Sequence, residues 1–167
     1  MLPIVRVTHD LETRRTVALC RLILATMNDC PFCALASGGE NDLLALRTGN
    51  VFVVPALKQR QLNLGHMLVL PTTHVTRMID LDPPVVQELY TVAGRVSIAV
   101  RQAFSATGAT LFQNDEAPEQ EFLHVHIHIV PRRAGDNFKL PDPLIQELNL
   151  QERQDQALAI RRLLTSR

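Results

Sequence analysis

The stretch His124-Val125-His126-Ile127-His128-Ile129-Val130-Pro131 indicates how the middle of this chain folds. Three histidines occupy every second position, and branched apolar residues stand between them. This alternation is typical of a β-strand whose two faces have different surroundings. We therefore expect the apolar side chains to face a core and the three imidazoles to line the opposite face. We also expect Pro131 to end the pairing, because proline has no backbone donor.

The spacing of the three histidines limits how they can bind a metal ion. Alternate residues on a strand lie roughly 6.6 Å apart, which separates His124 from His128 by about 13 Å. One zinc ion with bonds of about 2 Å cannot bind all three rings. The row is therefore expected to divide into a structural end and a substrate-facing end. The alternatives are a metal bound by two neighbouring histidines, as in some zinc hydrolases, and three surface histidines without function.

Size and composition predict a single globular domain. The chain has 167 residues, enough to bury a core, and its 46% apolar and 20% charged residues are ordinary for a globular protein. Seventeen basic and 17 acidic residues cancel, which argues against a nucleic-acid groove or a membrane surface. No apolar run is long enough to span a membrane, and the first six residues lack the layout of a signal peptide. We therefore expect a cytoplasmic protein.

Two of the three cysteines stand close together, in Cys30-Pro31-Phe32-Cys33. Two thiolates at this spacing can hold one zinc ion from a tight turn. The motif alone is ambiguous, because Cys-x-x-Cys also serves redox enzymes. A thioredoxin-like site would follow a strand, whereas residues 16–27 are predicted to be a helix. Cysteine usage of this kind fits a reducing compartment.

Glycines, prolines and short apolar runs predict three further strands. They cover residues 51–54, 65–71 and 109–113, and the residues between the first two strands, 56–62, are expected to be a loop. Prolines close the first two of these strands, and a glycine opens the second.

Two helices are predicted in the same way. Asp82 is a suitable N-cap before two prolines, and an apolar stripe from there to Phe104 predicts one long helix that stops at Gly108. Residues 150–164 predict a last amphipathic helix. The links between elements are of hairpin length, so the chain is expected to be an α+β fold. In this fold an antiparallel sheet packs against the long helix, with additional helices at the N- and C-terminal ends.

Three motifs in the same order resemble the histidine triad (HIT) superfamily of nucleotide hydrolases and transferases. The first is the His-x-His-x-His row itself, and the second is the block 65–74 (GHMLVLPTTH), which is similar to the family's Gly-His-x-Leu-Val-x-Pro-x-x-His. The third is Cys-x-x-Cys, which resembles the zinc knuckle of many bacterial members. The resemblance implies a HIT-like catalytic domain at 30–133. Residues 1–29 would then be an N-terminal extension with a helix, and residues 134–167 a C-terminal tail and helix packed on the same domain.

The resemblance also implies roles for individual residues. His126 would be the nucleophile, which attacks the α-phosphate of a nucleotide and holds it briefly as a nucleotidyl-imidazole. His66 and His128 would hold the phosphate oxygens and stabilise the charge that develops there. Gln120 matches a family glutamine that contacts the nucleophile or the leaving group. Asn114 lies in the region of the family's polar loop before the row and would contact the substrate.

The same resemblance implies a metal and partners. Cys30, Cys33, His74 and His124 would bind one structural zinc ion, and Mg²⁺ would be a second candidate cofactor, accompanying the nucleotide. The family also implies a homodimer, with a nucleotide as its small-molecule partner.

The chain departs from the family pattern at two places near the expected substrate. Eight residues before His66, where the family has Asp or Asn for the ribose hydroxyls, this chain has Lys58. Lysine cannot accept hydrogen bonds, so either the ribose is held differently or Lys58 meets an extra phosphate. The family's glycine before the glutamine is replaced by Glu119, and the loop is expected to approach the phosphate less closely.

The leading hypothesis is an enzyme of nucleotidyl transfer. It would hydrolyse dinucleoside polyphosphates or nucleoside phosphoramidates, or use phosphate in place of water. One alternative is a zinc-stabilised nucleotide-binding module with little turnover. Another is a transferase similar to galactose-1-phosphate uridylyltransferase, whose family normally has glutamine where His128 stands.

Overall fold

The structure is a computed structural model, and it describes residues 30–38, 41–116, 119–139 and 145–165. The helix expected at residues 16–27 lies outside these ranges, and the division of the chain at residues 29 and 133 stays a prediction. The described helices are α2 (Pro31–Ala36), α3 (Pro83–Ala103) and α4 (Leu150–Thr165), with 3-10 turns η1 (Asn41–Leu43), η2 (Gln61–Asn63) and η3 (Met78–Asp80). The strands are β1 (Leu46–Arg47), β2 (Val51–Pro55), β3 (Lys58–Arg60), β4 (Met67–Pro71), β5 (Gly108–Gln113), β6 (Ile127–Arg132) and β7 (Ile145–Glu147).

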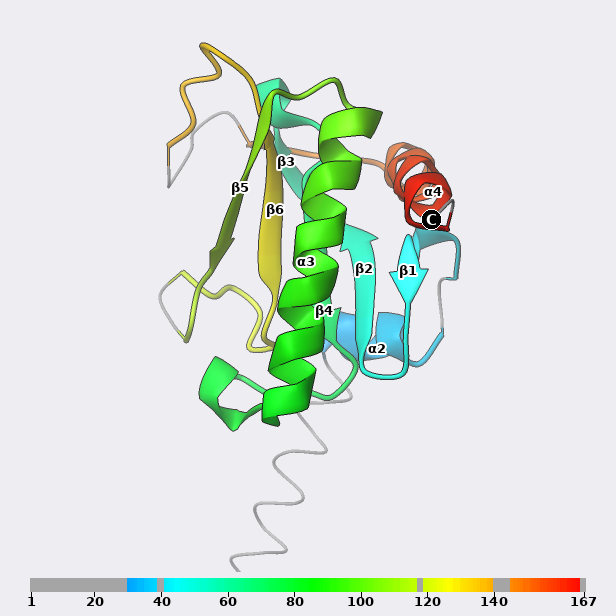
Figure 1. The fold of residues 1–167 in the computed structure, drawn as a ribbon, viewed down its shortest axis with the longest axis vertical. Coiled ribbons are helices and arrows are strands. Elements are labelled where there is room, and N and C mark those ends of the chain that lie inside the picture. The colour runs from blue at the N-terminus through cyan, green and yellow to red at the C-terminus, as the bar shows by residue number, and fades with distance from the viewer. Residues whose placement is uncertain (1–29, 39–40, 117–118, 140–144, 166–167) are drawn as a thin grey trace, which may run out of the picture.

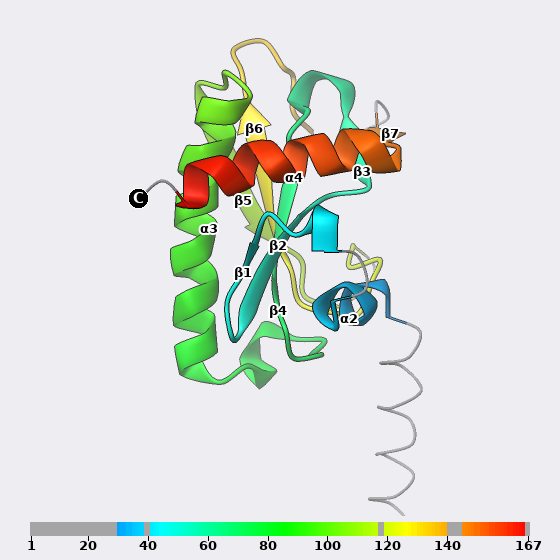
Figure 2. The same ribbon diagram turned by 90° about the vertical axis from the view of Figure 1, so that its right-hand side faces the viewer.

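An antiparallel five-stranded sheet forms the centre of the fold, in the order β1-β2-β4-β6-β5. The long helix α3 lies lengthwise across it (Figure 1) and packs against β2, β4, β5 and β6. The C-terminal helix α4 crosses the molecule beside a second, two-stranded sheet of β3 and β7 (Figure 2). The predicted α+β architecture is confirmed. In the described part of the chain no helix is both long enough and apolar enough to pass through a membrane.

The histidine row presents its apolar residues to the core, as predicted. Val125, Ile127 and Ile129 are at most 1% exposed and lie in one cluster with the buried face of α3. Burying each such side chain contributes about 1.5–3 kcal/mol to folding stability. Exchanging the two faces of the row would therefore cost several kcal/mol of folding free energy. The buried face of α3 consists of Leu89, Val92, Ala93, Val96, Ala99 and Val100.

Two details of the row differ from the sequence prediction. Strand β6 begins at Ile127, so only the last of the three histidines belongs to the ladder. Pro131 does not end the pairing with β5, because it stands opposite Ala109 and the ladder continues one residue further. Its carbonyl oxygen accepts a hydrogen bond of 2.7 Å from Nδ2 of Asn63. The pairing of β6 with β4 does stop short of Pro131, at Ile129.

Three further local predictions need correction. Residues 56–62 are not simply a loop, since they contain β3 and the first two residues of η2, and β3 pairs with β7 from the far end of the chain. Helix α3 ends at Ala103, and Gly108 begins β5 instead of stopping the helix. The turn between them passes through Ser105, whose φ is 51°. Asp82 does hold the N-cap position, but its side chain makes no capping hydrogen bond.

Gly65 stands just before β4, at a position where the backbone requires glycine. Its φ is 98°, which side chains with a Cβ rarely adopt, and the ring of Phe104 lies directly where a Cβ would be. This close approach seats the end of α3 against the start of β4 and fixes where His66 leaves the turn.

Replacing Gly65 by alanine should lower the free energy of unfolding by about 2–4 kcal/mol, because the methyl group meets the Phe104 ring while φ stays positive. Urea unfolding followed by circular dichroism measures the change. Gly94 on the exposed side of α3 supplies the matched control, since nothing lies within 4 Å of its Cβ position. Gly94→Ala should raise the free energy of unfolding by about 0.5–1 kcal/mol. A Gly65→Ala protein as stable as the wild type would show that Phe104 moves aside freely.

Candidate active site and metal centre

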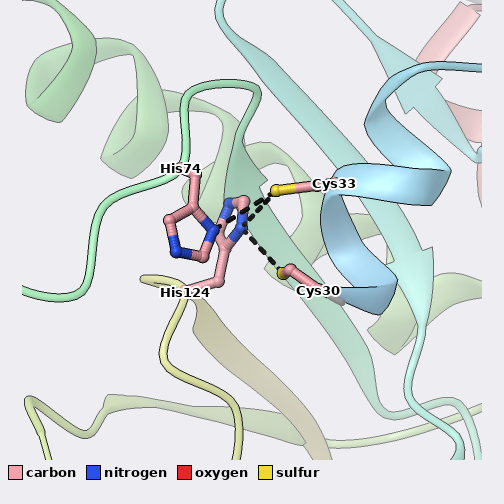
Figure 3. Close-up of side chains that lie close together, drawn as sticks. All are labelled: Cys30, Cys33, His74 and His124. Carbon is pink, nitrogen blue, oxygen red and sulfur yellow. Dashed lines mark hydrogen bonds between the residues drawn. The ribbon is translucent and has the colours of Figure 1, made fainter. Parts of the chain in front are cut away.

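Four predicted metal ligands converge beside α2. The ligand atoms of Cys30, Cys33, His74 and His124 all lie within 4.8 Å of one another (Figure 3). Nδ1 of His124 is 3.5 Å from Sγ of Cys30 and 3.7 Å from Sγ of Cys33, and Nδ1 of His74 is 3.3 Å from Sγ of Cys33. Ligands on a tetrahedral zinc ion with bonds of about 2.0–2.3 Å are separated by roughly 3.5 Å. The cluster therefore has the dimensions of a closed zinc site.

The surrounding structure prepares these side chains for a metal. Nε2 of His124 lies 3.0 Å from the carbonyl oxygen of Pro71, which can accept its proton and leave Nδ1 free to bind a cation. Burial lowers the pKa of His124 to about 4, so the ring is neutral at pH 7. Burial and the neighbouring Cys30 raise the pKa of Cys33 to about 12. A bound cation would be needed to keep this thiol ionised at neutral pH.

The other two histidines of the row meet His66 in a second cluster. Nε2 of His66 lies 2.9 Å from Nδ1 of His128, and the ring centroids of His126 and His128 are 4.6 Å apart. The structure thus brings together the three histidines predicted to act on phosphate. It also separates them from His124, whose Nδ1 faces the cysteines, so the row divides between two clusters, although only His128 lies on the strand that the spacing argument assumed.

The orientation of His126 is set by the main chain. Its Nδ1 donates a hydrogen bond of 2.7 Å to the carbonyl oxygen of His124. A ring that carries its proton on Nδ1 keeps a free lone pair on Nε2. The side chain is only 6% exposed, and this burial lowers its pKa, although the bond to the carbonyl partly offsets the effect. His126 is therefore a neutral imidazole with one nucleophilic nitrogen.

Burial keeps the partners of His126 neutral as well. The pKa of His66 falls to about 3 and that of His128 to about 2, first through burial and then through the neighbouring imidazoles. Neither ring carries charge at pH 7, so each contributes hydrogen bonds in place of a full positive charge.

Two phenylalanines frame the imidazoles, and the sequence analysis missed both. Phe112 stands opposite His128 in the β5–β6 register and stacks on it, with centroids 4.3 Å apart and planes inclined by 6°. Phe32 lies between the two cysteines in the sequence and packs against His124 and His126, at centroid distances of 5.8 and 5.4 Å. In the sequence, Phe32 is one of the two residues that separate the cysteines of the Cys-x-x-Cys motif, and nothing there indicates a contact with histidines. Phe112 could be identified only once the register of β5 and β6 was known.

The loop before the row holds the two predicted polar residues differently. Gln120 is 3% exposed, and its Oε1 accepts a hydrogen bond of 2.6 Å from the backbone N of Glu116. Its Nε2 is buried and has no hydrogen-bond partner among the described residues. Asn114 instead donates to the carbonyl oxygen of Glu119, at 3.2 Å, and so closes the loop that carries Gln120.

Lys58 reaches the same loop from β3. Its Nζ is 2.7 Å from Oε1 of Glu121, the residue after Gln120, and both side chains are exposed. This ion pair raises the pKa of Lys58, so the ammonium group is charged at neutral pH.

A second feature missed by the sequence analysis is a polar cluster around the buried Asp136. Asp136 accepts hydrogen bonds from Arg132, Asn63 and two backbone N–H groups, and these bonds hold its pKa well below the usual range. Arg133 donates to the carbonyl oxygens of Leu62 and Phe104. The two arginines after the row are thus bound within the protein.

Comparison with known proteins agrees with this geometry. Residues 53–135 match the HIT domain family. An uncharacterized HIT-like protein of Saccharolobus solfataricus is 32% identical over 108 residues, which are 64% of this chain and 76% of that protein. The bis(5'-adenosyl)-triphosphatase of Dictyostelium discoideum is 33% identical over 109 residues, which are 62% of this chain and 72% of that enzyme.

A solved structure has a similar fold over most of the chain. The zinc-bound histidine triad family protein of Mycobacterium smegmatis has a TM-score of 0.67 and 30% identity, covering 84% of this chain and 98% of its own. The family resemblance predicted from the three motifs is therefore confirmed by sequence and by fold. The row of three histidines in this chain is divided between a cysteine–histidine cluster and a cluster with His66. The chain belongs to the HIT family.

Proposed function

We propose that the protein is a nucleotide hydrolase that acts on an α-phosphate through a nucleotidyl-histidine intermediate at His126. The observation that carries the proposal is the bond from Nδ1 of His126 to the main-chain oxygen of His124, because it leaves Nε2 as the nucleophile. The bis(5'-adenosyl)-triphosphatase among the relatives supports a dinucleoside polyphosphate as substrate. A nucleoside phosphoramidate is the second candidate.

The reaction would proceed in two displacements. The lone pair on Nε2 of His126 attacks the α-phosphorus while the bond to the bridging oxygen breaks, and the leaving phosphate departs with that electron pair. Water then attacks the phosphorus, the phosphorus–nitrogen bond breaks, and the electron pair returns to Nε2 while the water proton passes to solvent. If inorganic phosphate replaces water in the second step, the same enzyme acts as a phosphorylase.

Neutral hydrogen-bond donors would stabilise the developing charge. If His66 donates from Nε2 to Nδ1 of His128, then His128 carries its own proton on Nε2 and can donate it to a phosphate oxygen. Gln120 supplies a second donor, since its buried Nε2 has no hydrogen-bond partner within the described residues. Asn114 would act less directly, by holding the loop, although it was first expected to contact substrate.

We further propose that Cys30, Cys33, His74 and His124 hold a structural zinc ion, which supplies a rigid cross-link between α2, the turn after β4 and the start of the row. Among the described residues the candidate metal cluster offers sulfur and nitrogen, ligands that suit zinc, and the expectation of Mg²⁺ gains no support. Its cysteines face histidines, which favours the metal interpretation over a redox motif.

A cytoplasmic location, a homodimer and the lack of a nucleic-acid partner also stay proposals.

The two alternative functions are less well supported. A binding module with little turnover needs no oriented nucleophile, whereas His126 is buried and directed by the main chain. A uridylyltransferase-like enzyme normally has glutamine at the position of His128, and here that position carries a histidine bound to His66. A panel of nucleotides assayed by product chromatography, with and without phosphate, separates these functions.

Replacing His126 by alanine should lower single-turnover hydrolysis at least about a thousandfold, because the nucleophile is lost. Nucleotide binding and thermal stability should change little, and both are measured on the same preparation. Quench-flow analysis of single turnovers gives the rate. Near wild-type rates in this variant would exclude the mechanism, and loss of nucleotide binding together with rate would make His126 a binding residue instead.

Metal analysis of purified protein should find about one zinc ion per chain, as a closed four-ligand site requires. Cys33→Ser should lower both the zinc content and the melting temperature, because one thiolate ligand is lost. Cys20→Ser is the control, since it removes a cysteine that is not among the four ligands, and its zinc content should equal that of the wild type. If Cys33→Ser leaves the zinc content unchanged, these four residues do not form the zinc site.

Replacing Lys58 by aspartate should shift preference from dinucleoside polyphosphates towards nucleoside phosphoramidates by about tenfold in the ratio of kcat/KM, since an ammonium contact to the longer phosphate chain is lost. Glu121→Gln frees Lys58 from its ion pair and should leave this ratio unchanged or raise it. If the ratio is the same in wild type and Lys58→Asp, Lys58 does not touch the substrate.

A further inference from the structure

We propose that Gln59 and Gln156 form a buried amide pair that positions His66, so that the C-terminal helix α4 supports the active site directly. Neither glutamine belongs to the motifs of the row or of the metal centre. Gln156 lies beyond residues 53–135, the part of the chain that matches the HIT domain family. The catalytic consequence of this pair rests on the function proposed above, whereas its structural consequence does not.

Gln59 forms hydrogen bonds with both the backbone N–H and the backbone carbonyl group of His66. Its Oε1 accepts hydrogen bonds from the backbone N of Gly65, at 2.9 Å, and of His66, at 3.2 Å. Its Nε2 donates to the carbonyl oxygens of Ala56, at 2.9 Å, and of His66, at 3.2 Å. The side chain is 1% exposed, so water cannot replace these bonds.

These partners define the orientation of the amide. Two backbone donors face one end of the Gln59 side chain, and two backbone acceptors face the other. Turning the amide over would place like groups against each other at four contacts. The Gln59 amide thus pairs with backbone donors and acceptors just before β4, as the backbone of a neighbouring strand would.

Gln156 completes the arrangement from α4. Its Oε1 accepts from Nε2 of Gln59 at 2.7 Å, and its Nε2 donates to Oε1 of Gln59 at 3.2 Å. The two amides are therefore joined by a reciprocal pair of hydrogen bonds, and Gln156 is only 8% exposed. Ala157, Ile160 and Leu164 of the same helix lie in the main core, which fixes the place of Gln156.

The residues before α4 hold the same strand. In the β3–β7 ladder Gln59 stands opposite Gln146, and the backbone N of Leu148 donates to the carbonyl oxygen of Leu57 at 2.9 Å. Figure 2 shows α4 running across the molecule beside these two strands. The C-terminal segment therefore holds β3 through its backbone and Gln59 through its side chain.

His66 depends on this support because its imidazole makes a directed contact with His128. The backbone of His66 is held by Gln59 on one side, and its Nε2 must stay 2.9 Å from Nδ1 of His128 on the other. Errors of about 1 Å in the placement of a catalytic group can cost on the order of a hundredfold in rate. A weaker hold on His66 should therefore slow the chemical step more than it weakens substrate binding.

The test compares Gln156→Met with Ile160→Val. Methionine keeps the length of the side chain and removes both hydrogen bonds to Gln59, and it should lower kcat about tenfold while KM stays within about twofold. The backbone amide signals of Gly65 and His66 in ¹H–¹⁵N spectra should shift. Ile160→Val loosens α4 by removing one methylene from the core, and it should reduce stability without changing kcat or those two signals.

A double-mutant cycle adds a second criterion. If Gln156 acts through Gln59, then Gln59→Met and the double variant should have the same kcat, because the path from α4 to His66 is already broken. Additive losses would overturn the proposal, and so would an unchanged kcat and unchanged amide signals in Gln156→Met. If the wild type shows no turnover, the proposed function fails. The amide signals then decide the positioning alone, and it is refuted if they do not move in Gln156→Met.

Discussion

The structure depends on the burial of three alternate residues, Val125, Ile127 and Ile129, beneath helix α3. Because their side chains must face the core, the histidines between them must face the other side of the sheet. A shift of one residue in register would place imidazoles in the apolar cluster beneath α3 and move the apolar side chains to the face that now holds the histidines. The packing energy of the core therefore selects the face that the histidines occupy, and hydrogen bonds to the main chain then orient the rings of His124 and His126.

Two candidate sites meet in the short segment before β6. His124 offers its ring to the cysteine cluster and its carbonyl oxygen to Nδ1 of His126. Phe32, which lies between the cysteines, packs against both of these histidines. The candidate metal centre and the proposed nucleophile are thus linked through one residue, His124, and one aromatic ring, that of Phe32.

Much of this was predictable from local patterns, and the rest depended on distant partners. The burial of Val125, Ile127 and Ile129 followed from their alternation with the histidines, and the long helix from its apolar stripe. Strand β3 could not be predicted, because Lys58 to Arg60 become a strand only through pairing with β7. For the same reason Gln59 looked like a loop residue, although its amide is among the most buried polar groups. Phe112 was missed because its stacking on His128 follows from register, which the sequence alone does not give.

The cations near the row are already engaged. Arg132 is paired with Asp136, Arg133 binds two carbonyl oxygens, and the imidazoles are neutral at pH 7. An anionic substrate would therefore meet uncharged donors at its reacting phosphate and an exposed ammonium group only further along, at Lys58, whose partner Glu121 is exposed as well. Salt screens exposed charges strongly and buried hydrogen bonds weakly. Rising ionic strength should thus weaken the binding of long polyphosphate chains while leaving short substrates almost untouched.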